Sequence, residues 1–266
     1  MNDAAERILD NPFTNAAIVG REFGVHRDTV RKVWNDIGVY HQIAAKKPFL
    51  TQAHREERLG YALVNINRDW SNVIFSDEKT FQTDRHQRTH LYRPRNARFE
   101  ERYIQPNRRS GRISCGVWGW IGRGGPGEMT MISRRLNSVG YVEILKDVLV
   151  PSLEAHGDLQ DFVFMQDNNS IHTALRTREW FKNNPNLELL NAPTNSPDLN
   201  PTEHFWAELT RDWKSVFPRN FQRLESYVVE RWEQWRGQTQ YFENLYDSMP
   251  HRINAVIDNN GGHTKY

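Results

Sequence analysis

The spacing of hydrophobic residues predicts a small helical segment near the start of the chain. Residues 14–36 carry apolar side chains at helical intervals on both sides of Gly24, which indicates two short helices around a tight turn. Glycine suits such a turn because it adopts backbone conformations that other residues resist. The second helix should begin near His26. The predicted buried positions are Ala16, Ile18, Val19, Val30, Val33 and Trp34.

Farther along the chain the pattern becomes that of β-strands. Apolar, β-branched and aromatic residues are concentrated at 73–81, 113–121 and 128–133, and the glycine-rich sequence GRGGPG at 122–127 separates the last two. These three segments predict an antiparallel meander.

After the meander, helices and strands alternate. The expected order is a helix at 138–156, a strand at 161–167, a helix at 172–184, a strand at 187–192 and helices from about 202. Strands followed by such alternation predict an α/β fold, in which a mixed sheet is flanked by helices. The helix-turn-helix segment adds a small all-α part in front of it.

The same patterns divide the chain into three parts. Residues 1–40 form the helix-turn-helix segment, 71–266 form the domain that contains the sheet, and 41–70 form a linker arm between them. The arm contains Pro48 and a predicted helix at 51–66. A chain of 266 residues is long enough for one large domain and one small one.

Composition excludes several classes of protein. Cys115 is the single cysteine, so the chain cannot form an internal disulfide, and a reducing compartment is favoured. The N-terminus lacks the charged-then-apolar order of a signal peptide, and no stretch approaches the ~20 apolar residues of a membrane span. We therefore expect a soluble protein with no membrane partner.

Positive charge is concentrated in one segment, although the formal net charge is only +2. The segment at 85–112 is rich in arginine and contains only Glu100 and Glu101 as acids. Arginine binds phosphate through a bidentate fork, which makes this arginine-rich loop a candidate DNA contact. A solvated loop without a partner is the alternative. The candidate contacts in the loop are Arg93, Arg95, Arg108 and Arg109.

The second helix of the N-terminal segment presents further candidate DNA contacts. In a helix-turn-helix motif the recognition helix directs its outer side chains toward the major groove. A helical hairpin that only packs is the alternative. The outer positions of this helix are Arg27, Asp28, Arg31 and Lys32.

Three acidic residues occupy positions that suit a metal site. Asp77 comes after the apolar run VIF and Asp167 after FVFM, so both should emerge from the ends of central strands. Glu203 should lie at the start of a helix, because Pro201 is favoured in a first turn. Three such carboxylates can hold two divalent ions about 3.5 to 4 Å apart for phosphodiester chemistry. The chain has no glycine-rich phosphate loop, serine–histidine pair or histidine zinc cluster that would compete.

Each acid, taken alone, has a structural alternative. Asp77 or Asp167 could cap backbone amides at the end of its strand. Asp198 could cap the turn in SPDLNP. Glu78 should point to the opposite face of the sheet from Asp77, because side chains alternate along a strand.

Tryptophans in the C-terminal third are predicted to be core residues. Aromatic side chains at helical spacing usually pack against one another, and stacking on DNA bases is the less common role. The residues concerned are Trp206, Trp213, Trp232 and Trp235.

Several blocks of the sequence resemble a known family. In order, FSDEKTF, FMQDNNSIHTA and NAPTNSPDLNPTEHFW resemble the three catalytic blocks of mariner-like transposases, which belong to the DDE integrase superfamily. The spacing also agrees, with 35 residues between Asp167 and Glu203. The segments KKPFLTQAHREERL, DWSNVIFSDE, RISCGVWGWI and SMPHRINAVIDNNGGHTKY extend the resemblance from about residue 14 to the end.

The resemblance implies a ribonuclease H-like catalytic domain and cut-and-paste DNA transposition. Asp77, Asp167 and Glu203 would be the catalytic ligands of two Mg²⁺ or Mn²⁺ ions. Asn169 and His172 would support these ligands or contact DNA, and a structural role at a helix start is the alternative for His172. The arginine-rich loop would contact DNA or a partner subunit.

The resemblance also implies partners and a location. The substrates would be double-stranded DNA, namely the inverted-repeat ends of a transposon and target DNA, commonly at TA, and the protein would act as a dimer or larger assembly in the nucleus. Family members usually carry two helix-turn-helix units, whereas this chain has room for one. A transposase-derived DNA-binding protein without productive transposition therefore stays open as an alternative. A stand-alone nuclease of the same fold would need no helix-turn-helix, so the presence of this pattern disfavours that alternative.

Overall fold

The protein consists of two compact units, Met1–Lys47 and Pro48–Tyr266, in a computed structural model. The structure describes residues 2–42, 47–84, 100, 112–133 and 135–266. Each unit has a hydrophobic core of its own. Within the described ranges, no helix is long and apolar enough to cross a membrane.

The N-terminal unit contains three helices, α1 (Asn2–Asp10), α2 (Ala16–Glu22) and α3 (Arg27–Asp36). The last two are the helices expected around Gly24, which adopts a φ of +66° in the turn. His26 caps α3, as expected from the sequence. The first helix was not predicted. The core of the unit is formed by Ala4, Ile8, Ala16, Val19, Val30 and Trp34.

The core of the N-terminal unit includes most, but not all, of the predicted residues of α2 and α3. Ile18 was expected in the core but is 47% exposed, whereas Ala16 and Val19 face the interior. The indole nitrogen of Trp34 donates a hydrogen bond to the Ala4 carbonyl oxygen over 2.7 Å, which ties α3 to α1. Val33 is only partly buried.

The larger unit is built on a five-stranded sheet with the order β3-β2-β1-β4-β5. β1 pairs antiparallel with β2, and β2 with β3, which is the predicted meander. β4 is parallel to both β1 and β5, so the sheet is mixed, as predicted. The strands are β1 (Val73–Gln82), β2 (Ser114–Gly122), β3 (Gly125–Ile132), β4 (Val163–Gln166) and β5 (Glu188–Asn191).

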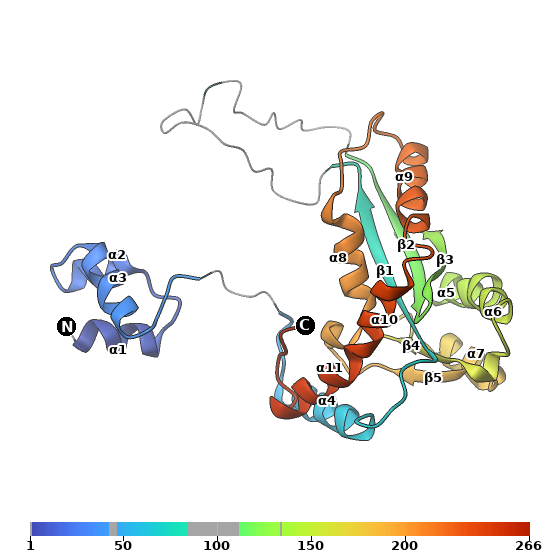
Figure 1. The fold of residues 1–266 in the computed structure, drawn as a ribbon, viewed down its shortest axis with the longest axis horizontal. Coiled ribbons are helices and arrows are strands. Elements are labelled where there is room, and N and C mark those ends of the chain that lie inside the picture. The colour runs from blue at the N-terminus through green and yellow to red at the C-terminus, as the bar shows by residue number, and fades with distance from the viewer. Residues whose placement is uncertain (1, 43–46, 85–99, 101–111, 134) are drawn as a thin grey trace. The chain divides into compact units, whose positions relative to one another are not determined.

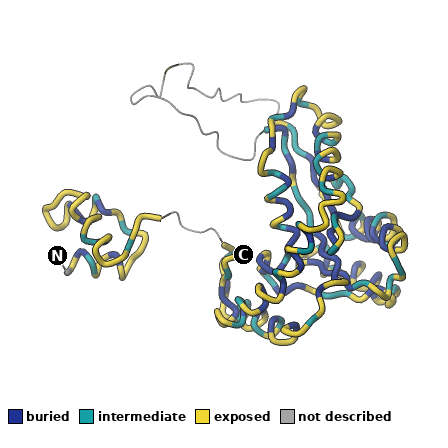
Figure 2. The backbone as a smooth tube through the Cα atoms, viewed as in Figure 1, coloured by how far each residue is buried: buried dark blue, intermediate teal, exposed yellow. Residues whose placement is uncertain are grey.

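Helices cover both faces of this sheet (Figure 1). Strand residues alternate between the two faces, so that Ile74 and Phe164 pack with α5 to α7, whereas Phe75 and Met165 pack with α8 to α11. β2, β4 and the first half of β1 are accordingly buried almost throughout (Figure 2). The helices are α5 (Ser138–Ile144), α6 (Val150–Glu154), α7 (Leu175–Asn183), α8 (Thr202–Arg211), α9 (Phe221–Glu233), α10 (Thr239–Asp247) and α11 (Met249–Asp258).

Two details differ from the helices expected here. The predicted helix at 138–156 is realised as α5, a π-helical segment at Leu145–Leu149, and α6. The predicted helix at 172–184 begins later, because residues 168–174 form turns before α7. The predicted tryptophan core is present: Trp206, Trp213 and Trp232 are buried, and Trp235 packs against the same cluster.

The expected linker arm at 41–70 is wrong in one respect, because most of it is α4 (Gln52–Val64), a helix of the larger unit. This helix packs against α11 within the larger unit, and Ala62 joins its core (Figure 1). The guanidinium of Arg58 is also buried there, where it is paired with a carboxylate. The boundary between the units therefore falls after Lys47.

Candidate active site

Asp77 and Asp167 come together where the parallel pairing of β1 with β4 ends. In the pairing of β1 with β4, Phe75 lies opposite Met165. The same register brings Asp77 level with Asp167, which immediately follows β4. Asp167 thus lies at a strand end, as predicted, whereas Asp77 lies within β1, which continues to Gln82 beside β2. Both carboxyl groups lie at the carboxyl end of β4.

Glu203 approaches this end of β4 from the first turn of α8. The side-chain amide of Asn200 donates to the Ser76 carbonyl oxygen over 3.1 Å. The Thr202 hydroxyl donates to the carbonyl oxygen two residues before Asp77, over 3.4 Å. These two bonds fasten the start of α8 to β1, so that Glu203 lies beside the strand that carries Asp77.

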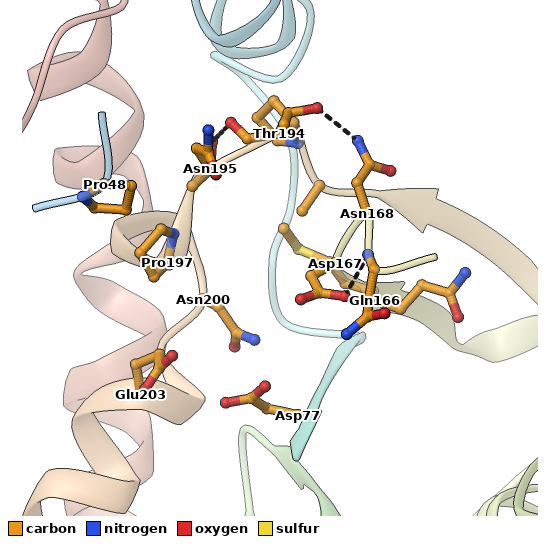
Figure 3. Close-up of a pocket in the computed structure, with 15 residues that line it drawn as sticks. Pro48, Asp77, Gln166, Asp167, Asn168, Thr194, Asn195, Pro197, Asn200 and Glu203 are labelled. Carbon is orange, nitrogen blue, oxygen red and sulfur yellow. Dashed lines mark hydrogen bonds between the residues drawn. The ribbon is translucent and has the colours of Figure 1, made fainter. Parts of the chain in front are cut away.

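All three acids line one open pocket of about 270 Å³. Figure 3 shows the Asp77 and Asp167 carboxylates directed into this space, with Glu203 on the helix that borders it. Water occupies about 30 Å³ per molecule in the liquid, so the pocket has room for a hydrated cation. Its other polar walls include Asn168, Asn169, Thr194 and Asn200.

The environment of Asp77 disfavours a negative charge. Burial raises the pKa of the Asp77 carboxyl well above its usual value. The charges of Glu203 and Glu78 raise this pKa further, and that of Asp167 acts in the same direction. The indole nitrogen of Trp206, one turn after Glu203, donates to Asp77 Oδ2 over 2.9 Å and holds the carboxylate in place.

Asp167 has a cationic neighbour instead. His172 Nδ1 lies 2.6 Å from Asp167 Oδ1, and His172 Nε2 lies 3.1 Å from Glu78 Oε1. Burial by itself would lower the pKa of His172, but the hydrogen bonds and charges of the two acids raise it to about 9. His172 therefore carries a proton on both ring nitrogens at neutral pH and donates to both acids. Burial opposes ionisation of Asp167, but the His172 hydrogen bond and charge keep the pKa of Asp167 lowered.

The donor set of the pocket fits a hard divalent cation. Three carboxylates and the Asn200 amide border one space, and oxygen donors of this kind suit Mg²⁺ and Mn²⁺. The raised pKa of Asp77 reflects burial first and then the charges of the neighbouring acids, and a bound cation would offset those charges. Lys79 Nζ lies 3.8 Å from Glu203 Oε2 and supplies part of that compensation. Among the described residues, no three acidic, histidine or cysteine side chains converge on one ion position as they stand.

The other candidate residues of the catalytic blocks have well-defined contacts. Asn169 lines the pocket, and its backbone N–H donates to Asp167 Oδ1 over 2.9 Å. The His172 side chain is only 3% exposed and its ring lies 4.3 Å from that of Tyr141. This placement fits a residue that orients Asp167, and it does not put His172 on a surface that DNA could touch.

The predicted DNA contacts of the N-terminal unit lie on the outside of α3. Asp28 accepts a hydrogen bond from Arg31 over 3.2 Å, so the acid holds that guanidinium along the helix surface. The exposed positions of α3 include Arg27, Asp28, Arg31 and Lys32. The predicted contacts of the arginine-rich loop, Arg93, Arg95, Arg108 and Arg109, lie outside the described residues.

Sequence reasoning missed several side chains that support the pocket. Glu78 does point to the face opposite Asp77, as expected, but there it binds His172. Trp206 was expected only as core, although its position three residues after Glu203 places both side chains on one side of α8. Asp198, expected as a turn cap, accepts two hydrogen bonds from Arg58 at 2.8 and 2.7 Å.

The sequence is similar to those of known proteins. Residues 72–226 match the model of the family described as DDE superfamily endonuclease. The transposase of transposable element Tc1 from Caenorhabditis elegans is 32% identical over 90% of this chain and 87% of its own length. The transposase of Tcb2 from Caenorhabditis briggsae is 31% identical over the same shares of the two chains.

The structure is similar to one described as the Mos1 transposase paired-end complex with left transposon end, with a TM-score of 0.82. The match covers 99% of this chain and 79% of that one at 15% sequence identity. A second structure, the mariner Mos1 paired end complex with Mg, matches with a TM-score of 0.81 and 16% identity over 98% of this chain and 79% of the other. These matches confirm the predicted ribonuclease H-like fold with its helical N-terminal segment.

Proposed function

Because the chain belongs to the DDE superfamily endonucleases and to the family of Tc1 transposases, we propose that it uses Asp77, Asp167 and Glu203 to cut and join DNA strands at transposon ends. The chain is a DNA transposase, and its reactions are the hydrolysis and transesterification of phosphodiesters. The observation that carries the assignment of residues is the shared pocket, which brings together three carboxylates from three separate segments of the chain.

The three carboxylates would hold divalent cations, and the Asn200 amide, bonded to Ser76 and Thr202, would keep Glu203 in place beside them. The enzyme uses a divalent metal, and we propose two Mg²⁺ or Mn²⁺ ions per site. When bound, such ions activate the attacking oxygen and stabilise the leaving oxygen of the phosphodiester. Solved paired end complexes of mariner Mos1 with Mn and with Mg support this choice of metals.

The remaining side chains of the site keep the acids in position. Trp206 holds one oxygen of Asp77 and leaves the other directed toward the pocket. Protonated His172 holds Asp167 Oδ1 and anchors itself on Glu78. Orientation of ligands by fixed outer partners of this kind commonly affects metal affinity and activity by 10- to 100-fold.

The helix-turn-helix unit would bind the inverted-repeat ends of the element through α3. Arg27, Arg31 and Lys32 present positive charge on the exposed side of this helix. We also propose that two or more copies act together on paired ends and then on target DNA, commonly at TA. Solved structures of Mos1 as a paired-end complex and as a strand transfer complex support action on paired ends and then on target DNA.

A cleavage assay tests the catalytic proposal. Supercoiled plasmid would be incubated in Mg²⁺ or Mn²⁺ with the wild type and with Asp77→Ala, Asp167→Ala and Glu203→Ala. We expect nicking by the wild type and its loss in all three variants, with Asp147→Ala, an exposed acid, as the matched control. Nicking that survives in any of the three variants would remove that residue from the site. An inert wild type that still binds DNA would instead support a transposase-derived DNA-binding protein.

A binding titration tests the DNA-facing role of α3. Arg31→Ala should weaken binding to a transposon-end duplex and reduce the slope of log affinity against log salt by about 1, because one phosphate contact is lost. Circular dichroism should be unchanged, since Arg31 is exposed. If Arg31→Ala and the wild type have equal affinity and equal salt dependence, the exposed face of α3 is not the DNA-binding surface.

We further propose that the protein acts in the nucleus. Its DNA substrate would lie there in a eukaryotic cell, and the relatives that support this are from Caenorhabditis. Imaging of a tagged full-length chain checks this, and exclusion of the tag from the nucleus would contradict it.

A further inference from the structure

Two adjacent side chains of α4, Glu57 and Arg58, reach the two loops that carry acids of the pocket. The first loop follows β4 and contains Asp167 and Asn168. The second, residues 192–201, joins β5 to α8 and leads to Glu203. The helix lies far from both loops in the sequence, so its contacts are tertiary.

Glu57 connects the two loops through a single carboxylate oxygen. Its Oε1 accepts hydrogen bonds from the Thr194 backbone N–H over 3.0 Å and from the Thr194 hydroxyl over 3.2 Å. The same oxygen accepts from the Asn168 side-chain amide over 3.4 Å. The Asn168 amide also donates to the Thr194 hydroxyl over 3.3 Å, so the three groups form a closed set. Asn168 immediately follows Asp167, so this set restrains the position of that acid relative to the second loop.

Arg58 holds the second loop from the inside of the unit. Its guanidinium is 1% exposed and forms a bidentate pair with Asp198, at 2.8 and 2.7 Å. It also donates to the Ser196 hydroxyl over 2.8 Å. Both partners lie in the segment that ends at Glu203, and Asn200 then fastens that segment to β1.

The C-terminal segment completes the support. Arg58 donates to the carbonyl oxygens of Gly261 and Gly262 over 2.9 and 3.1 Å, and the Thr264 hydroxyl donates to Asp198 Oδ2 over 2.8 Å. Gly261 has a φ of +76°, and a side chain there would meet the backbone of α4 at 1.9 Å. The close approach of α4 to this segment therefore requires glycine.

From these contacts we infer that α4 fixes the spacing between Asp167 and Glu203, with Glu57 and Arg58 as positioning residues for the metal site. This inference rests on the proposed function, because it takes the two acids to be metal ligands. Glu57 does not line the pocket, so it acts through the loops and not on a bound ion. A role limited to stability is the competing explanation for both residues.

Glu57 gives the cleaner test, because Arg58→Ala would leave the Asp198 charge buried and unpaired and could prevent folding. The variants are Glu57→Ala, Glu57→Gln and the matched control Glu56→Ala, which removes a neighbouring exposed acid of the same helix. Glutamine retains a side-chain oxygen that can accept the three hydrogen bonds, so it should restore what alanine loses.

The first readout is hydrogen exchange of the metal-free full-length protein. In Glu57→Ala, amides at residues 192–200 should exchange faster than in the wild type, whereas Glu57→Gln and Glu56→Ala should match the wild type. Unchanged exchange in Glu57→Ala would overturn the inference whether or not the protein binds metal.

The second readout is Mn²⁺ affinity by isothermal titration, with Tm and strand cleavage measured in parallel. We expect Glu57→Ala to bind Mn²⁺ about tenfold more weakly, with a similar loss of cleavage and nearly unchanged Tm. The glutamine variant should recover most of both. A lowered Tm with wild-type Mn²⁺ affinity would overturn the inference in favour of a stability role. A wild type that neither binds Mn²⁺ nor cleaves DNA would refute the proposed function, and the exchange experiment would still decide on the positioning role of α4.

Discussion

The pocket and the Arg58–Asp198 cluster shift the pKa of a carboxyl group in opposite directions. Asp198 is the more deeply buried acid, yet its pKa is lowered, whereas half-buried Asp77 has a raised pKa. Asp198 is surrounded by Arg58 and the Thr264 hydroxyl. The nearest charges around Asp77 are other acids. Burial raises the pKa of both groups, and the neighbours decide the outcome: acids add to the rise at Asp77, whereas Arg58 and Thr264 outweigh burial at Asp198.

This difference separates an acid that serves folding from one that serves chemistry. A buried carboxylate whose charge is matched by a bidentate guanidinium fixes the segments around it, and its charge is already balanced without a metal ion. A carboxylate held among other carboxylates destabilises the metal-free protein and has an affinity for cations. Disruption of the Arg58–Asp198 pair should therefore lower the stability of the metal-free protein, whereas removal of the Asp77 charge should raise it.

The largest effect is expected from Arg58→Met. The substitution leaves the buried Asp198 without its cation, which should lower the free energy of unfolding by about 3 to 5 kcal/mol. Urea unfolding at neutral pH measures this. The double variant Arg58→Met with Asp198→Asn should recover part of the loss, because the stranded charge is removed as well. A loss below about 1 kcal/mol would show that the pair is not a structural support.

Low pH should weaken the Arg58–Asp198 pair. Burial would raise the pKa of Asp198, but the hydrogen bond and charge of Arg58, with the Thr264 hydroxyl, lower it below the usual 3.8. A lowered folded-state pKa means that this stabilisation is fully present above the unfolded-state value and is lost as pH falls below about 3.8. Urea midpoints of the wild type and Asp198→Asn should differ most at neutral pH and approach each other in that acid range. A constant difference would contradict the assignment.

Asp77→Asn should instead raise the free energy of unfolding of the metal-free protein. The amide removes a charge that burial and three neighbouring acids disfavour, and it can still accept the Trp206 hydrogen bond. We expect the metal-free protein to gain about 1 kcal/mol of unfolding free energy, as in other exchanges of stability for activity. Strand cleavage should be lost. A destabilised Asp77→Asn protein would mean that the acid is part of a structural network.

The smallest effect is expected from Lys79→Met. Lys79 and Glu203 are both about a third exposed, and their 3.8 Å pair should contribute less than about 0.5 kcal/mol to stability. Removal of this positive charge leaves the pocket more negative, so Mn²⁺ should bind a few-fold more tightly in isothermal titration. Weaker Mn²⁺ binding would indicate that Lys79 supports the site in another way.

Local patterns in the sequence were sufficient for most of the fold. Strand alternation and helical spacing identified β1 to β5 and the helix-turn-helix, because each signal lies within one short segment. The positions of Asp167 after a strand and of Glu203 in the first turn of a helix also followed from local order, whereas Asp77, expected at a strand end, lies within β1. That they share one pocket depends on the parallel pairing of β1 with β4, which joins segments about 90 residues apart and leaves no local pattern in the sequence.

The missed features depend on contacts between distant parts of the chain. α1 supplies only Ala4 and Ile8 to its core, which is too few apolar residues to stand out as a pattern. α4 falls in the predicted linker because an arginine is usually exposed. The carboxylate that allows Arg58 to be buried, Asp198, is 140 residues away in the sequence. The contact of His172 with Glu78 crosses from one loop to a strand in the same manner.

The most direct test of the pocket as a cation site is the Mn²⁺ dependence of thermal unfolding in the wild type and in Asp77→Asn. We predict that Mn²⁺ raises the Tm of the wild type, because a ligand that binds only the folded state stabilises it. Asp77→Asn should start from a higher Tm without metal and gain nothing from Mn²⁺. An equal Mn²⁺-dependent rise in both proteins would contradict the assignment of Asp77 as a metal ligand.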